Sequence, residues 1–318
     1  MAETKEQIRY VYGPVKSWRS GTSLGIDPIG EISTCSFNCA YCQLGKIQKH
    51  IYKIATYVPT EQIIRDLKEL EKENRFSYEN LDVITFAGSG EPTLAENLGE
   101  IIDEIRKLNS DVDISILTNA TTLNDKAVRE RVLKADLVSL KLDAPDDNYL
   151  KSINQAADGV SVESIISGIK LLKADIHEIA SAATQPRNDV ATSNRNDGNL
   201  SSRAQRGDPF PKLQIQIMFL EKFAKDEVYI EKLCALLNEI EIFDIQINTP
   251  SRPKPVSKTG EYWIETRGNH YGDASKLETP DYIEYKEMPV IDKETAFALE
   301  AKIRSLLKKE ANIVNVYQ

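Results

Sequence analysis

Apolar and polar positions follow two repeating patterns along most of the chain. Short apolar runs predict β-strands, and the segments between them carry apolar residues at every third or fourth position, which is typical of amphipathic helices. The predicted strands are Leu24–Glu31, Leu81–Ala87, Val112–Thr118, Leu137–Leu142, Leu213–Leu220 and Ile242–Asn248. Helices are predicted after Pro59, from Leu98, over Asp125–Lys134, from Val162, around Ile230 and from near Asp292. Strands and helices that alternate in this way favour an α/β fold with a parallel sheet, open or curled.

Three of the predicted strands carry polar side chains at every second position. These polar residues are Ser139, Lys141, Asp143, Gln214, Gln216, Asp244, Gln246 and Asn248. The apolar residues at the alternate positions would contact helices, whereas the polar residues would line the inside of a barrel. An ordinary barrel interior is packed with branched apolar side chains. We therefore predict a partial (β/α)6 TIM-like barrel around a solvated chamber. An antiparallel sheet with one wet face is the alternative, although helices separate the strands.

The pattern divides the chain into four parts. The barrel is expected from residues 1–181 and 212–257. Residues 182–211 are rich in Asn, Ser, Arg and Asp and predict a disordered low-complexity insertion. Residues 258–291 contain Trp263 and several tyrosines, which suits a lid or a packing flap. Residues 292–318 are expected to form a C-terminal helix and tail.

The overall charge argues against a general nucleic-acid binder. The 318 residues carry a net charge of −9, whereas phosphate contacts need clustered Lys and Arg. Met1–Gln7 lack an apolar signal core, and no apolar run approaches the length of a membrane span. We expect a cytoplasmic protein that does not insert into membranes.

Three of the four cysteines lie close together, as Cys35, Cys39 and Cys42 in the spacing Cys-x3-Cys-x2-Cys. Three thiolates can hold three irons of a cubane cluster and leave the fourth iron open to a second molecule. Cys234 follows Ile230 by one helical turn and is expected in the core. A structural zinc site needs a fourth ligand, for which His50 is near enough, and zinc stays an alternative. A ferredoxin-type carrier would want a fourth cysteine.

These residues resemble a known family. The cysteine motif, with Tyr41 before its third cysteine, resembles the radical S-adenosylmethionine (radical SAM) superfamily. The segment 12–28, which leads into the cysteines, resembles the Fe–S oxidoreductase branch related to the wyosine-base synthases. Further segments with the same resemblance are Gly88–Leu94, Leu117–Ala120, Leu140–Ala144 and Asn248–Pro253. The resemblance covers nearly the whole chain except 182–211 and most of 258–289.

The resemblance implies a [4Fe-4S] cluster on Cys35, Cys39 and Cys42, with S-adenosylmethionine chelated to the open iron. A one-electron donor of the flavodoxin or ferredoxin type would reduce the cluster. Cleavage of S-adenosylmethionine would yield a 5′-deoxyadenosyl radical, which would abstract hydrogen from an unknown substrate.

The same resemblance implies roles for residues in the first two matching motifs. Tyr41 would lie beside adenine, with a core aromatic as the alternative. Gly88, Ser89 and Gly90 follow the second predicted strand and would approach the methionine moiety. Glu91 would accept a hydrogen bond from its ammonium group or orient the loop.

Residues at the ends of later strands are further candidates. Thr118 and Asn119 suit ribose hydroxyls, with a turn or helix cap as the alternative. Asp143 faces the polar interior by parity and is a candidate contact for ribose or substrate.

Three cationic residues are candidates for catalysis. Arg19 and Arg252 are expected near the barrel mouth, where a guanidinium could clamp a carboxylate or phosphate, with a surface salt bridge as the alternative for each. Lys141 points inward by parity and could bind an anionic substrate or form an imine with a carbonyl substrate.

Two other functions stay open. One is tRNA wyosine-type base modification, although this chain has no spare set of cysteines for a second cluster, and its acidic balance gives tRNA little attraction. The other is a non-catalytic zinc or iron–sulfur binding module, which would not need the glycine motif after the second strand.

Overall fold

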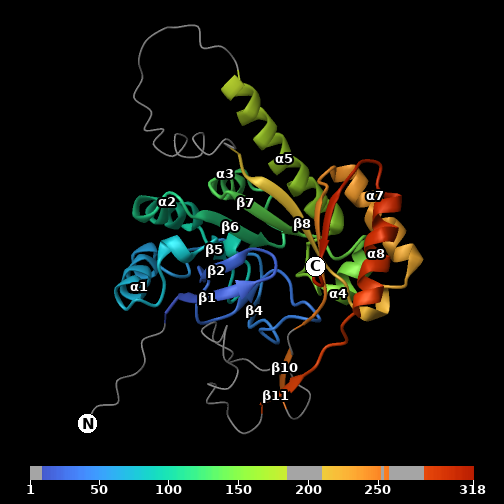
Figure 1. Cartoon of the computed structure of the whole chain (residues 1–318), viewed down its shortest axis with the longest axis horizontal. Coiled ribbons are helices and arrows are strands. Elements are labelled where there is room, and N and C mark those ends of the chain that lie inside the picture. Colours follow the sequence, from blue (N-terminus) through green and yellow to red (C-terminus); the bar gives the residue numbers. More distant parts are fainter. Residues whose placement is uncertain (1–8, 185–209, 252–253, 258–282) are drawn as a thin grey trace.

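The structure is a computed structural model, and it describes residues 9–184, 210–251, 254–257 and 283–318. Its centre is a curved sheet of eight strands in the order β1-β2-β5-β6-β7-β8-β9-β12. The strands are β1 (Val11–Ser17), β2 (Gly21–Ile26), β5 (Val83–Phe86), β6 (Asp113–Thr118), β7 (Leu137–Lys141), β8 (Lys212–Met218), β9 (Asp244–Asn248) and β12 (Asn312–Asn315). All neighbouring pairs are parallel except β1 and β2. The sheet is an open, curled half-barrel (Figure 1).

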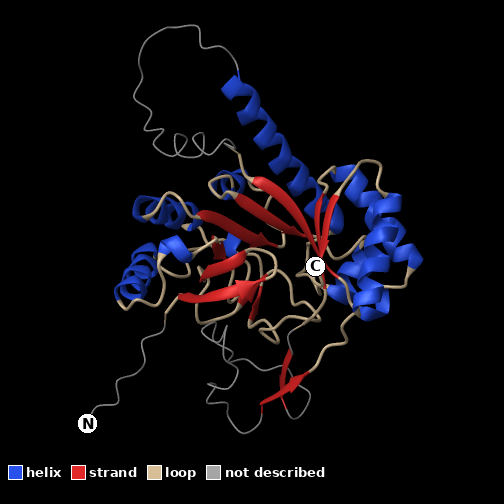
Figure 2. Ribbon diagram, viewed as in Figure 1, coloured by secondary structure: helices blue, strands red, loops and turns tan. Residues whose placement is uncertain are grey.

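Helices lie along the outer side of the sheet, and the long loops lie on the other side (Figures 1 and 2). The helices are α1 (Thr60–Lys72), α2 (Leu98–Leu108), α3 (Lys126–Val132), α4 (Asp147–Ile153), α5 (Val162–Thr184), α7 (Glu227–Ile240) and α8 (Lys293–Leu306). Four of them begin at an aspartate whose side chain accepts hydrogen bonds from the first turn, which satisfies amide groups that have no helical partner. These aspartates are Asp125, Asp146, Asp226 and Asp292.

The predicted α/β class and parallel sheet are confirmed, and the antiparallel alternative is wrong. Each of the six predicted strands overlaps an observed strand, and each predicted helix is present. Strands β1 and β12 and helix α4 were not predicted. Strand β1 contains Gly13-Pro14 and an irregular register, so it shows no clean alternation. Strand β12 has four residues, too few for a periodic signal, and it places the C-terminal segment within the main sheet rather than in a separate tail.

Alternate side chains along the strands face opposite sides of the sheet. One set packs in the hydrophobic core beneath the helices, and the other lines the inside of the half-barrel. Ile215 and Ile217 of β8 and Ile245 and Ile247 of β9 are fully buried in the hydrophobic core. The intervening polar residues point to the opposite face, as predicted. Two small sheets lie outside this barrel: β3 (Thr34–Cys35) pairs with β4 (Lys49–His50), and β10 (Lys254–Ser257) pairs with β11 (Ile283–Lys286).

Several predictions fall outside the described residues. They are most of the insertion predicted at 182–211, most of the extension predicted at 258–291, and Arg252. Among the described residues, no helix is both long and apolar enough to cross a membrane.

The core position of Cys234 leads to a prediction about pH. This thiol on α7 is 1% exposed, and burial raises its pKa from 9.0 to about 11. The neutral thiol therefore contributes stability that is present below pH 9 and is lost as the pH rises towards 11, because the unfolded chain releases this proton first. Between pH 8 and pH 10, the wild-type protein should lose about 1 kcal/mol of unfolding free energy relative to Cys234→Ala. Urea titrations of both proteins at the two pH values measure this difference, and a constant difference would contradict it.

Candidate functional site

A cavity of about 420 Å³ opens on the inner side of the sheet. It is lined by residues from the cysteine loop, from the ends of the strands and from the β1–β2 turn. Of the residues singled out in the sequence, it brings together Arg19, Cys35, Cys39, Tyr41, Cys42, Gly88, Gly90, Glu91, Thr118, Asn119 and Lys141. Its volume falls within the usual range for small-molecule sites, about 300–1,000 Å³.

The cysteine loop, residues 33–48, is held on both sides by backbone hydrogen bonds. On one side, the Thr34 amide donates to the Ser89 carbonyl (3.0 Å), and the Glu91 amide donates to the Thr34 carbonyl (3.0 Å). On the other side, the Asn38 amide donates to the Asn154 carbonyl (2.9 Å), and the Ala40 amide donates to the Ile153 carbonyl (2.8 Å). The loop is therefore anchored to the segment after β5 and to the end of α4.

Amide groups of the protein approach two of the three sulfurs. The Phe37 backbone amide lies 3.4 Å from Cys35 Sγ, and Asn119 Nδ2 lies 3.5 Å from the same sulfur. Asn154 Nδ2 lies 3.4 Å from Cys39 Sγ. Burial raises the pKa of the Cys35 thiol well above its usual value and raises that of Cys39 to about 12. Burial therefore favours the neutral thiols of both residues in the protein alone.

Gly88 and Gly90 lie where other parts of the protein leave no room for a side chain. A Cβ on Gly90 would lie 1.8 Å from the Thr34 carbonyl oxygen. Gly88 has a φ of +153°, and a Cβ there would lie 2.4 Å from the Asp27 carboxyl carbon. The sequence suggested that these glycines admit a ligand. Both do line the cavity, but their closest neighbours are the cysteine loop and Asp27.

Glu91 is buried and fully engaged by protein donors. Its Oε1 accepts hydrogen bonds from the Thr93 hydroxyl and the Thr118 hydroxyl, both at 2.7 Å. Its Oε2 accepts from the Asn119 backbone amide at 2.7 Å. Burial raises the pKa of the carboxyl group, and these donors oppose the shift. Of the two expected roles, the geometry supports the one in which Glu91 orients the loop, joining the ends of β5 and β6.

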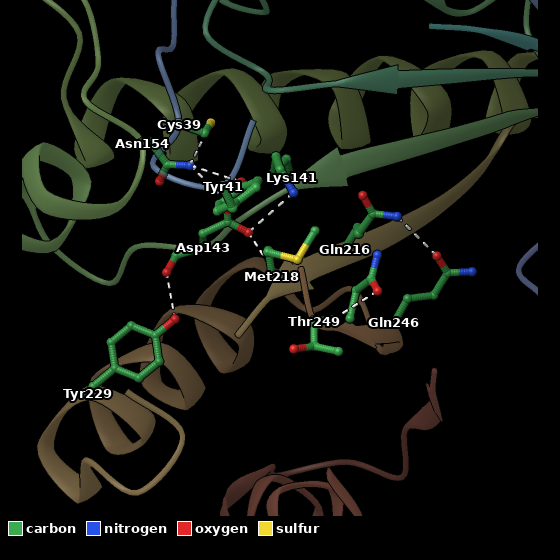
Figure 3. Close-up of polar contacts among 11 residues, drawn as sticks. Cys39, Tyr41, Lys141, Asp143, Asn154, Gln216, Met218, Tyr229, Gln246 and Thr249 are labelled. Carbon is green, nitrogen blue, oxygen red and sulfur yellow. Dashed lines mark hydrogen bonds and ion pairs between the residues drawn. The ribbon is translucent and has the colours of Figure 1, made fainter. Parts of the chain in front are cut away.

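Tyr41 belongs to a buried polar network (Figure 3). Its hydroxyl donates to Asp143 Oδ2, and that oxygen also accepts from Asn154 Nδ2 at 2.7 Å. Lys141 Nζ lies 3.5 Å from Asp143 Oδ1 and 5.1 Å from the centroid of the Tyr41 ring. Met218 donates its backbone amide to the same Oδ1 at 2.8 Å. Asp143 thereby ties the cysteine loop to strands β7 and β8.

Thr118 and Asn119 combine a turn with the cavity wall. The Thr118 hydroxyl accepts a hydrogen bond from the Ala120 amide at 3.0 Å. Asn119 Nδ2 donates to the Ser36 hydroxyl at 2.8 Å, so this side chain contacts the cysteine loop. The side chains of both residues thus bond within the protein, and both residues also line the cavity, where contacts to ribose stay a prediction.

Two sequence predictions need correction. Ser89 is 1% exposed and does not line the cavity, because its hydroxyl donates to Asp27 Oδ2 at 2.6 Å. Asp143 is 2% exposed and does not line the cavity either, because its oxygens accept from Tyr41, Asn154 and Met218. Both residues support the site from behind its wall. Arg252 lies outside the described residues.

The donor set fits an iron–sulfur cluster better than a single metal ion. Within the described ranges, no three His, Cys, Asp or Glu side chains converge closely enough to hold one ion. A cubane cluster takes each thiolate on a different iron, so its ligands need not converge. His50 Nε2 lies 3.2 Å from the Ser36 carbonyl oxygen, so the residue considered as a fourth zinc ligand contacts the loop backbone.

Sequence reasoning missed three supporting residues. Asn154 sits just beyond α4, a helix that was not predicted, so nothing near it in sequence marked it. Asp27 and Ser36 are short polar residues in loops, and such residues usually occur there for turn formation. Their partners lie 62 and 85 positions away, in contacts that only the fold creates.

The profile of the Radical SAM superfamily matches residues 32–182. UPF0026 protein slr1464 of Synechocystis sp. is 40% identical over 262 residues, which are 82% of this chain and 82% of that protein. GTP 3',8-cyclase of Clostridium botulinum is 31% identical over 128 residues, or 39% of this chain and 36% of that enzyme. Among solved structures, native anSMEcpe with bound AdoMet is similar with a TM-score of 0.45 and 20% identity, covering 74% of this chain and 52% of that one.

The close approach at Gly90 leads to a test of how the cysteine loop is anchored. Gly90→Ala should lower the unfolding free energy of the metal-free protein by about 1–3 kcal/mol, because the added methyl group must displace Thr34. Iron content after anaerobic reconstitution should fall as well, since Thr34 precedes Cys35.

Gly99→Ala on α2 is the matched control. Its added methyl group would meet only the side chains of Arg131 and Lys134, at 3.1 Å or more. Alanine is also favoured over glycine in a helix, so this variant should be as stable as the wild type or more so. Chemical denaturation and iron analysis measure both variants. Equal behaviour of the two would contradict the anchoring role of Gly90.

Proposed function

This chain belongs to the radical SAM superfamily, in the group of UPF0026 proteins, and from that premise we propose that its cysteine loop and cavity form the active site of a hydrogen-abstracting enzyme. Members of the superfamily are enzymes that bind a [4Fe-4S] cluster and S-adenosylmethionine, and this chain is a radical SAM enzyme of that type. The observation that carries the proposal is the placement of all three loop cysteines on the wall of one cavity.

Cys35, Cys39 and Cys42 are the proposed cluster ligands. Their loop is already anchored by backbone hydrogen bonds, so binding requires little reorganisation of the chain. The side-chain amides of Asn119 and Asn154 donate towards Cys35 and Cys39 and would offset the negative charge on these sulfurs.

Residues on the neighbouring strands β5 and β6 are the proposed grip on S-adenosylmethionine. Gly88 and Gly90 present backbone at the cavity wall, while Thr118 and Asn119 present side chains there. Tyr41 is held by Asp143, which places its ring beside the same cavity. Glu91 keeps this part of the wall in place. When bound, the cluster and S-adenosylmethionine supply the 5′-deoxyadenosyl radical that abstracts hydrogen from the substrate.

Lys141 and Arg19 are proposed to face the substrate. Both line the cavity, Lys141 from β7 and Arg19 from the turn between β1 and β2. Radical SAM enzymes generally need a one-electron donor. We propose a flavodoxin or ferredoxin type for this chain.

The alternatives gain less support. The GTP 3',8-cyclase relative has GTP in its name. This chain spans only 36% of that enzyme, so we do not assign GTP to it as a substrate. A wyosine-type activity on tRNA would call for further cysteines, and the only other one, Cys234, is buried on α7. A non-catalytic module would leave the polar cavity beside the cysteines without a role.

Replacing a cluster ligand tests the assignment of the cysteines. Cys39→Ala should lose most of its iron and sulfide after anaerobic reconstitution, and dithionite with S-adenosylmethionine should then yield no 5′-deoxyadenosine. Cys234→Ala is the matched control and should keep the iron content and cleavage activity of the wild type. Iron analysis and chromatography of the nucleoside product give both readouts. Normal cleavage by Cys39→Ala would overturn the assignment.

The amide of Asn154 provides a second test. A hydrogen bond to a ligand sulfur stabilises the more negative, reduced state of a cluster. Asn154→Ala should therefore lower the midpoint potential of the reconstituted protein, as measured by a redox titration followed by electron paramagnetic resonance. Asn148→Ala on the exposed side of α4 should leave the potential unchanged. If the midpoint potential is unchanged in both variants, the Asn154 amide does not stabilise the reduced cluster.

A further inference from the structure

Three neighbouring strands present a row of polar side chains to the cavity. Lys141 of β7 is the register partner of Gln216 of β8, which is in turn the partner of Gln246 of β9. All three side chains line the cavity (Figure 3). Adjacent strands lie about 4.8 Å apart, so the row spans roughly 10 Å. Asn248, two residues beyond Gln246, extends the same face.

The carboxamides of this row are buried but incompletely paired. Gln216, Gln246 and Asn248 are 7%, 6% and 8% exposed. Gln216 and Gln246 share a hydrogen bond of 3.4 Å, and Asn248 Oδ1 accepts from the Thr249 amide at 2.9 Å. All three carboxamides line the cavity, where their remaining N–H and C=O groups can pair with a polar ligand.

The charges around the cavity favour an anion. Among the described residues that line it, Lys16, Arg19 and Lys141 are cationic, and Glu91 is the single carboxylate. Glu91 already accepts hydrogen bonds from four protein donors. Lys141 is the cation within the row itself, and its ammonium group lies beside the Tyr41 ring and 3.5 Å from Asp143 Oδ1, a carboxylate behind the cavity wall.

The row is separate from the proposed grip on S-adenosylmethionine. That grip comes from β5 and β6, whereas Lys141, Gln216 and Gln246 come from β7, β8 and β9, further along the sheet. A second molecule could therefore occupy the row while the first part of the wall is filled.

We propose that Lys141, Gln216, Gln246 and Asn248 form the substrate site, and that the substrate is a small polar acid. Its carboxylate or phosphate pairs with Lys141, and an amide or carbonyl group within roughly 10 Å pairs with the carboxamides. This inference rests on the proposed function, because it names the substrate class of that active site.

Simple acids and amides test this chemistry on the reconstituted protein with S-adenosylmethionine bound. The probes are adipamic acid, which joins a carboxylate to an amide, its phosphonate analogue, the neutral adipamide, and hexanoate, which lacks the amide. Isothermal titration should show adipamic acid or the phosphonate binding about tenfold more tightly than adipamide or hexanoate. The tighter of the two acids identifies a carboxylate or a phosphate substrate.

Variants then assign each preference to a residue. Lys141→Met should abolish the preference for acids over adipamide, and Gln246→Leu should abolish the preference for adipamic acid over hexanoate. Lys151→Met, at an exposed position on α4, is the control and should bind every probe like the wild type. The proposal is overturned if the wild type shows neither preference, or if either preference survives in its variant.

Cleavage of S-adenosylmethionine without substrate separates this proposal from the proposed function. The wild type and the control Lys151→Met should both release 5′-deoxyadenosine under dithionite, at the same rate. Cleavage by the wild type together with neither probe preference would overturn the substrate site alone. Absence of cleavage in the wild type would overturn the proposed function itself, whatever the probes show.

Discussion

The site depends on the double anchoring of the cysteine loop. A loop of this length has many conformations in water, and fixing each residue costs about 1–2 kcal/mol. Backbone hydrogen bonds to Ser89 and Glu91 on one side, and to Ile153 and Asn154 on the other, offset that cost. Gly90 permits the first contact because any side chain there would overlap Thr34. Cys35 and Cys39 lie between these two anchors.

Three buried carboxylates extend this anchoring to the strands. Asp27 accepts from the Ser89 hydroxyl, Glu91 accepts from residues at the end of β6, and Asp143 accepts from Tyr41 and Asn154. Burying a carboxylate is costly unless donors surround it. Each of the three meets several N–H or O–H groups from other elements, so displacing any of these elements would leave a carboxylate short of partners. The loop, β5, β6 and α4 are thereby coupled into one frame around the cavity.

Much of this arrangement could be predicted. The apolar periodicity revealed the strands β2, β5, β6, β7, β8 and β9 and the helices between them, because each element must bury one face. The alternation in β7, β8 and β9 predicted a polar interior, since a side-chain period of two leaves no other face for Lys141 or Gln216. What escaped prediction was short or irregular: α4 and β12 offer few residues for a periodic signal, and the register of β1 is irregular around Gly13-Pro14. Asp143 and Ser89 were assigned to the cavity by parity and motif, whereas their hydrogen-bond partners come from other segments and hold them behind its wall.

The amino-acid sequence by itself determined the class of fold, the cysteine motif and the polar parity, because periodicity and motif spacing are local properties of the chain. Only the tertiary structure decided which polar residues face the cavity and which support it from behind. That distinction depends on hydrogen bonds between residues far apart in sequence, such as Asn154 with Cys39. It also depends on strand register, which aligns Lys141, Gln216 and Gln246 in one row. Register is a property of paired strands, and no single strand specifies it.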